Sequence, residues 1–126
     1  MPTPQRRFAC VPPGEPRLLE GARLFNAGAY FEAHDAWESL WHEVDGEERA
    51  LLQGLIQFAV AFYHVMRGNR TGAEELYLKG RTRVARWAPE HAGLALGTLL
   101  EAVDAYFSAI RRGVSPGPQP TVTFIA

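Results

Sequence analysis

An apolar run over residues 51–66 constrains this chain more than any other feature of its sequence. Only Gln53, Gly54, Gln57 and His64 interrupt the run, and its apolar residues fall on almost every side of a helix. Such a helix is stable in water only when neighbouring elements cover it, so we expect it at the centre of the fold. The run is too short for the roughly 20 residues that cross a bilayer.

The spacing of apolar residues is also helical in the segments around this run. It predicts helices over residues 16–26, 29–44, 47–67, 69–87 and 89–112. Gly28, Gly46 and Gly68 separate neighbouring segments, as glycine does where a helix ends. No segment of this central part alternates like a strand, and the short connections favour antiparallel neighbours. We therefore expect an all-α fold class, with one domain over residues 1–126 that is an array of about five helices.

Both ends of the chain are expected to be irregular. Residues 1–15 and 114–126 carry most of the prolines, which fix φ and remove a backbone donor. The last six residues are apolar and β-prone. This tail is expected to pack against the body of its own chain or against a partner chain.

The charge balance excludes some classes of partner. Thirteen basic and 14 acidic residues leave a net charge of −1. Binding of nucleic acid or of a membrane surface is usually accompanied by a basic excess, so we expect neither partner. One cysteine, Cys10, cannot form an intramolecular disulfide, and residues 1–7 lack the apolar core of a signal peptide. A cytoplasmic protein is expected.

The first candidate for chemistry is a pair of polar residues in the expected helix 29–44. His34 and Glu38 lie at one shoulder of its apolar arc, between the aromatic residues Phe31 and Trp41. Side chains four residues apart face the same direction on a helix. The imidazole and the carboxylate can therefore touch each other or bind one ion.

The central helix supplies a second set of polar side chains. Gln53, Gln57 and His64 fall within about 40° of one another around that helix. This polar strip either faces solvent through a gap between neighbours or meets His34 and Glu38 across the hairpin. The second arrangement would gather two imidazoles, one carboxylate and two amides in a partly closed pocket.

The segment from His34 to Trp41 matches the pattern H-x-x-x-E-x-x-W. With residues 25–33, 55–57 and 67–73, it resembles the small prokaryotic proteins grouped as domain-of-unknown-function family 309. The resemblance covers about residues 18–85. It implies an all-helical fold and a metal-binding role for the signature, and it implies no particular reaction.

On this resemblance, the hypothesis for the site is one divalent ion, Zn, Mn, Fe or Ni, held by His34, Glu38 and His64. The pocket around it would be lined by Phe31, Trp41, Gln53 and Gln57. A dinuclear ferritin-like centre is disfavoured, because the chain has one His-x-x-x-Glu and no second copy. His42 and His91 have no acidic residue four positions later. If the protein is an enzyme, metal-assisted hydrolysis with Glu38 as ligand or general base is the class to test.

Two other interpretations remain open. In the first, His34 and Glu38 form an internal hydrogen-bonded clasp, and the chain is a protein-interaction module of tetratricopeptide-like hairpins. A weak internal sequence repeat favours this module. At an offset of 40 residues, it aligns Gly28, Ala33 and Trp37 with Gly68, Ala73 and Tyr77.

The second interpretation is that the chain associates with a copy of itself. A chain of 14.0 kDa offers limited cover for so apolar a central helix, and the tail adds another apolar strip. We therefore expect a homodimer with an isologous contact. Val122, Phe124 and Ile125 would lie in that contact or pack on their own body.

Overall fold

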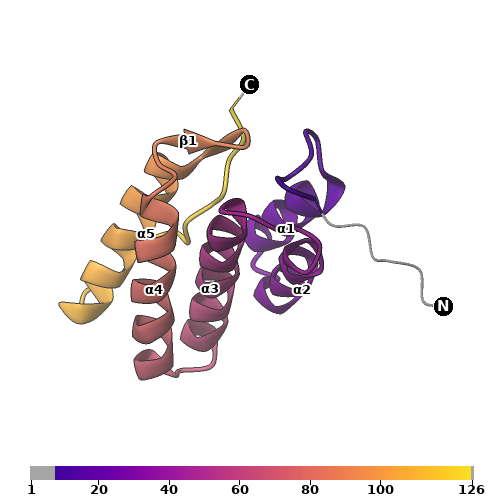
Figure 1. The fold of residues 1–126 in the computed structure, drawn as a ribbon. Coiled ribbons are helices and arrows are strands. Elements are labelled where there is room, and N and C mark those ends of the chain that lie inside the picture. The colour runs from indigo at the N-terminus through magenta and orange to yellow at the C-terminus, as the bar shows by residue number, and fades with distance from the viewer. Residues whose placement is uncertain (1–7, 126) are drawn as a thin grey trace.

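The computed structural model describes residues 8–125, and within them five helices and one short hairpin follow one another along the chain. The elements are α1 (Pro16–Asn26), α2 (Tyr30–Trp41), α3 (Glu48–Met66), α4 (Arg70–Ala85), β1 (Glu90–His91), β2 (Leu94–Ala95) and α5 (Leu96–Arg111). Figure 1 shows α3 between the α1–α2 pair on one side and α4 on the other, with α5 beyond α4. The all-α class and the array of five helices are confirmed.

Local sequence explains where several helices begin and end. The side chains of Glu15 and Asn69 accept the backbone N–H of Arg17 and Gly72, at 2.6 and 3.0 Å, and so cap α1 and α4. Gly28 has a φ of 79° in the connection after α1, where a residue with a Cβ would be strained. These short connections turn each helix back against its predecessor.

An aromatic cluster around Phe62 joins four of the helices. The Phe62 ring on α3 lies 5.1 to 5.7 Å from four other ring centroids. These rings belong to Phe25 on α1, Tyr30 on α2, and Tyr106 and Phe107 on α5. The expectation that the apolar run of residues 51–66 forms the central core helix is therefore confirmed.

The expected helix over residues 89–112 is wrong at its beginning. Residues 90–95 form an antiparallel hairpin, β1–β2, and α5 starts only at Leu96. Ala92 and Gly93 form its two-residue turn with φ values of 52° and 78°. Such a turn matches the twist of a hairpin and cannot continue a helix. Helix α2 is also shorter than expected, because residues around Val44 form a strand-like bridge with Phe8.

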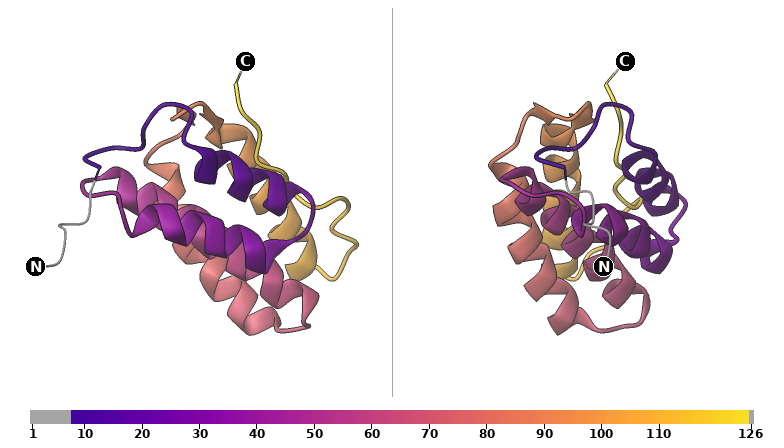
Figure 2. Two further views of the ribbon diagram at one scale, coloured as in Figure 1. Left: turned by 90° about the vertical axis from the view of Figure 1, so that its right-hand side faces the viewer. Right: turned by 45° about the vertical axis from the view of Figure 1, so that its right-hand side comes forward.

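The C-terminal tail packs on the body of its own chain, which was one of the two expected arrangements. Val122 is buried, and its backbone N–H and C=O both bond the side-chain amide of Asn26, at 2.7 and 2.8 Å. Phe124 forms a bridge with Leu94 of the hairpin. Figure 2 shows the tail rising past α1 toward the hairpin end of the molecule. Of the irregular N-terminal segment expected over residues 1–15, residues 1–7 lie outside the described part, and so does Ala126 of the tail.

Candidate functional site

Helix α2 places the His34–Glu38 pair at the edge of its buried face, as the sequence predicted. Tyr30, Ala33, Trp37 and Leu40 are buried on that face. The side chain of His34 next to them is 24% exposed and that of Glu38 is 42% exposed. The pair is therefore held by the core on one side and open to solvent on the other.

The imidazole and the carboxylate contact each other directly. His34 Nε2 lies 2.7 Å from Glu38 Oε2, a close ion-pair contact. His34 Nδ1 is buried and lies 3.2 Å from Asp35 Oδ1, but without the alignment of a hydrogen bond. The other oxygen of Glu38 lies 3.6 Å from His42 Nε2, so one carboxylate stands between two imidazoles. We call His34 and Glu38 the dyad.

A small pocket of about 190 Å³ lies between α2 and α3 next to the dyad. It is lined by Tyr30, Phe31, His34, Val60, Tyr63 and His64. Two of the three expected metal ligands, His34 and His64, therefore line one pocket. The expected lining residue Phe31 is also there, and its ring is 53% exposed although it is a large apolar side chain.

The structure places the other expected lining residues elsewhere. Trp41 lies at the end of α2, where the Arg49 guanidinium sits 3.7 Å from its ring centroid. Gln57 Oε1 accepts a hydrogen bond of 3.3 Å from Arg83 on α4. Gln53 is half-buried and is not among the residues that line the pocket. The polar strip of α3 therefore divides, with His64 facing α2 and Gln57 facing α4.

The donor atoms do not form a three-ligand centre in the described residues. His64 Nδ1 lies 3.3 Å from the Asn69 side-chain nitrogen, at the C-terminal end of α3. Among residues 8–125, no group of three His, Cys, Asp or Glu side chains is arranged to hold an ion. The 2.7 Å contact of the dyad is a close pair of an imidazole and a carboxylate, in which Glu38 lies against Nε2 of the ring. Metal binding by His34, Glu38 and His64 stays a prediction.

Sequence reasoning missed several residues of this region. Tyr30, Val60 and Tyr63 line the pocket, and His42 approaches Glu38. Tyr30 precedes His34 by four residues and His42 follows Glu38 by four, so helical spacing could have identified both. Burial raises the pKa of Tyr30 to about 12, with a smaller contribution from Tyr106, so its hydroxyl stays protonated at neutral pH.

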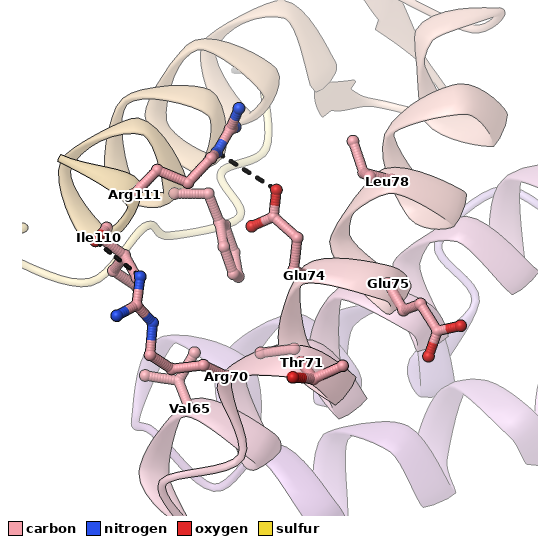
Figure 3. A pocket seen from close by; sticks show the side chains of 10 residues that line it. Val65, Arg70, Thr71, Glu74, Glu75, Leu78, Ile110 and Arg111 are labelled. Carbon is pink, nitrogen blue, oxygen red and sulfur yellow. Dashed lines mark hydrogen bonds and ion pairs between the residues drawn. The ribbon is translucent and has the colours of Figure 1, made fainter.

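A larger cleft of about 520 Å³ lies between α4 and α5, and Figure 3 shows its lining from close by. Arg111 contacts Glu74 across this cleft at 3.2 Å, and Arg70 donates to the carbonyl of Ile110 at 2.9 Å. Deeper along the same helices, the Tyr77 hydroxyl and the Arg81 guanidinium both bond Asp104. These contacts tie α4 to α5, so Arg70, Glu74 and Arg111 of the cleft already have partners within the fold.

No helix in the described part of the chain is long and apolar enough to cross a membrane. The cytoplasmic location and the absence of a nucleic-acid partner stay predictions.

The fold and the site define a small all-α protein with a histidine–carboxylate dyad beside an aromatic pocket. Residues 18–76 match the family model described as Domain of unknown function (DUF309), so the resemblance seen in the sequence is confirmed. The matched residues include most of α1 and all of α2 and α3, and hence both the dyad and its pocket. A comparison with curated proteins gave no match.

Proposed function

We propose that the protein binds one compact, mostly apolar ligand in the pocket between α2 and α3, and that His34 and His64 recognise its polar group. One observation carries this proposal: two imidazoles, one of them 2.7 Å from the Glu38 carboxylate, line the same aromatic pocket. Ligand sites are commonly apolar concavities with a few convergent polar groups.

The size of the pocket limits the ligand. An engineered apolar cavity of about 150 Å³ holds one benzene ring, so a pocket of 190 Å³ suits a single small ring. Phe31 and Tyr63 would pack against the faces or edges of that ring, because their own rings lie 5.8 Å apart beside the pocket. The exposed ring of Phe31 would lose solvent contact when a ligand binds.

The polar end of the ligand would meet nitrogen atoms of defined orientation. Glu38 Oε2 lies 2.7 Å from Nε2 of His34, and the Asn69 side-chain nitrogen lies 3.3 Å from Nδ1 of His64. A neutral imidazole offers one donor and one acceptor, so a hydroxyl group, which can both donate and accept, is the matching ligand group.

The test is a titration with phenol and with toluene, two rings of similar size of which only phenol carries a hydroxyl. We expect amide NMR shifts at Phe31, Val60 and Tyr63, and an affinity for phenol at least about fivefold higher than for toluene, about the worth of one hydrogen bond. His34→Ala and His64→Ala should each remove this preference. His42→Ala is the matched control, because His42 contacts Glu38 and does not line the pocket. Shifts confined to other parts of the chain would contradict the proposal.

Metal binding is the alternative function of the same site, and it can be tested on the same protein. His34 with Glu38 behind it is an arrangement that metal sites use, with the carboxylate orienting the ligating imidazole. Elemental analysis of protein purified without an affinity tag, followed by Zn²⁺ titration, should then give one ion per chain and loss of that ion in His34→Ala. Substoichiometric metal in both proteins, with no affinity on titration, would exclude it.

We also propose that the protein is a homodimer. Apolar side chains that remain exposed, among them Leu19, Met66 and Leu78, support an association between copies. Light scattering at micromolar concentration should give about twice the chain mass of 14.0 kDa. A mass near that of one chain would contradict the dimer, and an intact dimer after deletion of residues 118–126 would place the interface outside the tail.

A further inference from the structure

A second cavity, separate from the α2–α3 pocket, lies at the end of the molecule that carries the hairpin. It has a volume of about 550 Å³, within the range of small-molecule sites. Four segments that are distant in sequence form it: residues 11–14 with the start of α1, the first residue of α3, the β1–β2 turn, and the tail at Phe124. None of its lining residues lines the α2–α3 pocket, so this cavity is independent of the proposed function.

The polar group of this cavity is a second histidine–carboxylate pair. His91 Nε2 lies 2.5 Å from Glu48 Oε2, and Glu48 Oε1 accepts the backbone N–H of Val11 at 2.6 Å. The side chain of Glu48 is only 13% exposed. Both of its oxygens are therefore held by the fold, and the orientation of the imidazole is held with them.

The neighbours of His91 fix it further. The Trp87 ring lies 4.5 Å from the His91 ring. Ala92, the residue after His91, begins the hairpin turn with a φ of 52°. This conformation is unfavourable for an L-residue with a Cβ. Residues other than glycine adopt this left-handed backbone conformation mainly where the surrounding structure holds them in it.

The charge of the lining selects the kind of ligand. Its ionisable side chains are Glu15, Glu48 and His91. The Arg17 guanidinium is hydrogen-bonded to Glu15 and holds the pKa of that carboxyl below its usual range, so Glu15 is an ionised carboxylate whose charge Arg17 balances. Among residues 8–125, the negative charge of the lining that has no guanidinium beside it is that of Glu48. In the neutral form of His91 that donates its Nε2–H to Glu48, the remaining nitrogen Nδ1 is an acceptor. An acceptor backed by a carboxylate attracts a cationic donor and repels an anion.

The rest of the lining is apolar. Val11, Pro12, Pro13 and Leu18 contribute to the wall, and Leu19 and Phe124 are large apolar side chains that remain partly exposed. The aromatic ring of Phe124 also suits a positive charge, because a ring face attracts cations. The ligand should therefore combine an ammonium group with an apolar body.

We infer that this cavity binds a small organic ammonium compound, with its nitrogen donating to His91 and its apolar part lying against α1 and Phe124. The inference rests on the geometry of His91, Glu48 and the apolar wall, and it extends beyond the pocket of the proposed function. It names a ligand class, a primary alkylammonium ion with an apolar substituent, and no reaction.

The test compares 2-phenylethylammonium with 3-phenylpropionate, which has the same apolar body and the opposite charge. In an NMR titration of the unmodified chain, we expect the ammonium compound to shift the amides of Leu19, His91 and Gly93. The carboxylate should bind at least about tenfold more weakly, because a charge-assisted hydrogen bond is lost and a repulsion is added. Equal or tighter binding of the carboxylate would overturn the inference without any variant.

Variants locate the binding. Glu48→Gln keeps one acceptor oxygen, which can still bond the Val11 N–H, and removes both the negative charge and the second oxygen that meets His91. His91→Ala removes the acceptor. Each variant should bind the ammonium compound about tenfold or more weakly. Circular dichroism should show that both variants keep the helical content of the unmodified chain. His34→Ala, in the other pocket, is the control and should leave the affinity unchanged. Binding that survives both cavity variants, or that His34→Ala removes, would overturn the inference.

Discussion

Gly21→Ala should destabilise the protein by about 3 kcal/mol, because overpacking a buried position forces the surrounding side chains and backbone to move. Gly21 is buried on α1 against α2. A Cβ at this position would lie 2.1 Å from Trp37 Nε1 and 2.3 Å from Cδ1 of the same ring. Trp37 is fully buried and its indole N–H donates to the carbonyl of Leu18 at 3.2 Å, so the ring cannot move aside without losing that bond.

The measurement is urea unfolding followed by circular dichroism, with Gly97→Ala as the matched control. Gly97 is also a helical glycine, near the start of α5, but a Cβ there would meet Pro89 at an ordinary 3.5 Å. Alanine is the better helix former, so the control should gain about 0.5 kcal/mol. A loss below about 1 kcal/mol for Gly21→Ala would mean that α1 can move away from α2 at little cost.

This clash has a functional consequence, because α1 packs against α2, the helix that carries the dyad. The carbonyl of Leu18 on α1 fixes Trp37, which follows His34 by one turn of α2. If the Gly21→Ala chain remains folded, displacement of Trp37 should also disturb the dyad. Phenol titration of that variant would report the disturbance as a weaker preference over toluene.

Much of the fold could be predicted because the central helix constrains everything around it. Residues 51–66 are apolar on nearly every side, and a helix of that kind must lie between others. Gly28 and Gly68 mark two of the connections, and both have positive φ in the structure. These local signals agree with the tertiary packing, so the order and the approximate bounds of the first four helices followed from them.

The hairpin at residues 90–95 could not be predicted in the same way. Leu94, Leu96, Leu99 and Leu100 continue a helical apolar spacing, and Pro89 suits the first turn of a helix. The decisive conformation is that of Ala92, an alanine with a φ of 52°, which alanine adopts only where the surroundings impose it. The tail imposes it here, since Ala95 donates to Thr123 and Ile125 donates to Gly93.

The candidate site was also predictable from the sequence only in part. The dyad of His34 and Glu38 depends only on helical spacing, so the sequence was sufficient to predict it. The position of His64 beside His34 was one of two alternatives, because it depends on the rotation of α3 against α2. That same rotation turns Gln57 toward Arg83, and no sequence pattern reports it. The His91–Glu48 pair joins residues 43 positions apart, so only the tertiary fold could reveal it.

Alkaline pH should unfold the protein through Tyr30 and Tyr77. Burial raises the pKa of each hydroxyl to about 12, and for Tyr77 the hydrogen bond to Asp104 adds to the effect. Below about pH 10 the phenols are protonated in folded and unfolded chains alike, so stability is intact. Between about pH 10 and 12 the unfolded chain ionises first, and the free energy of unfolding should fall by roughly 2 kcal/mol for each tyrosine.

Tyr30→Phe separates this effect from general alkaline damage. The Tyr30 hydroxyl is buried without a hydrogen-bond partner among residues 8–125, so its removal should cost little stability near pH 8. The variant should lose about 2 kcal/mol less than the wild type between pH 8 and pH 12 in urea unfolding experiments. Tyr63→Phe is the control, because its hydroxyl meets Arg67 at the surface and its removal should leave the alkaline loss unchanged. Equal losses in Tyr30→Phe and the wild type would mean that the folded chain admits the Tyr30 phenolate, and hence that water reaches this part of the core.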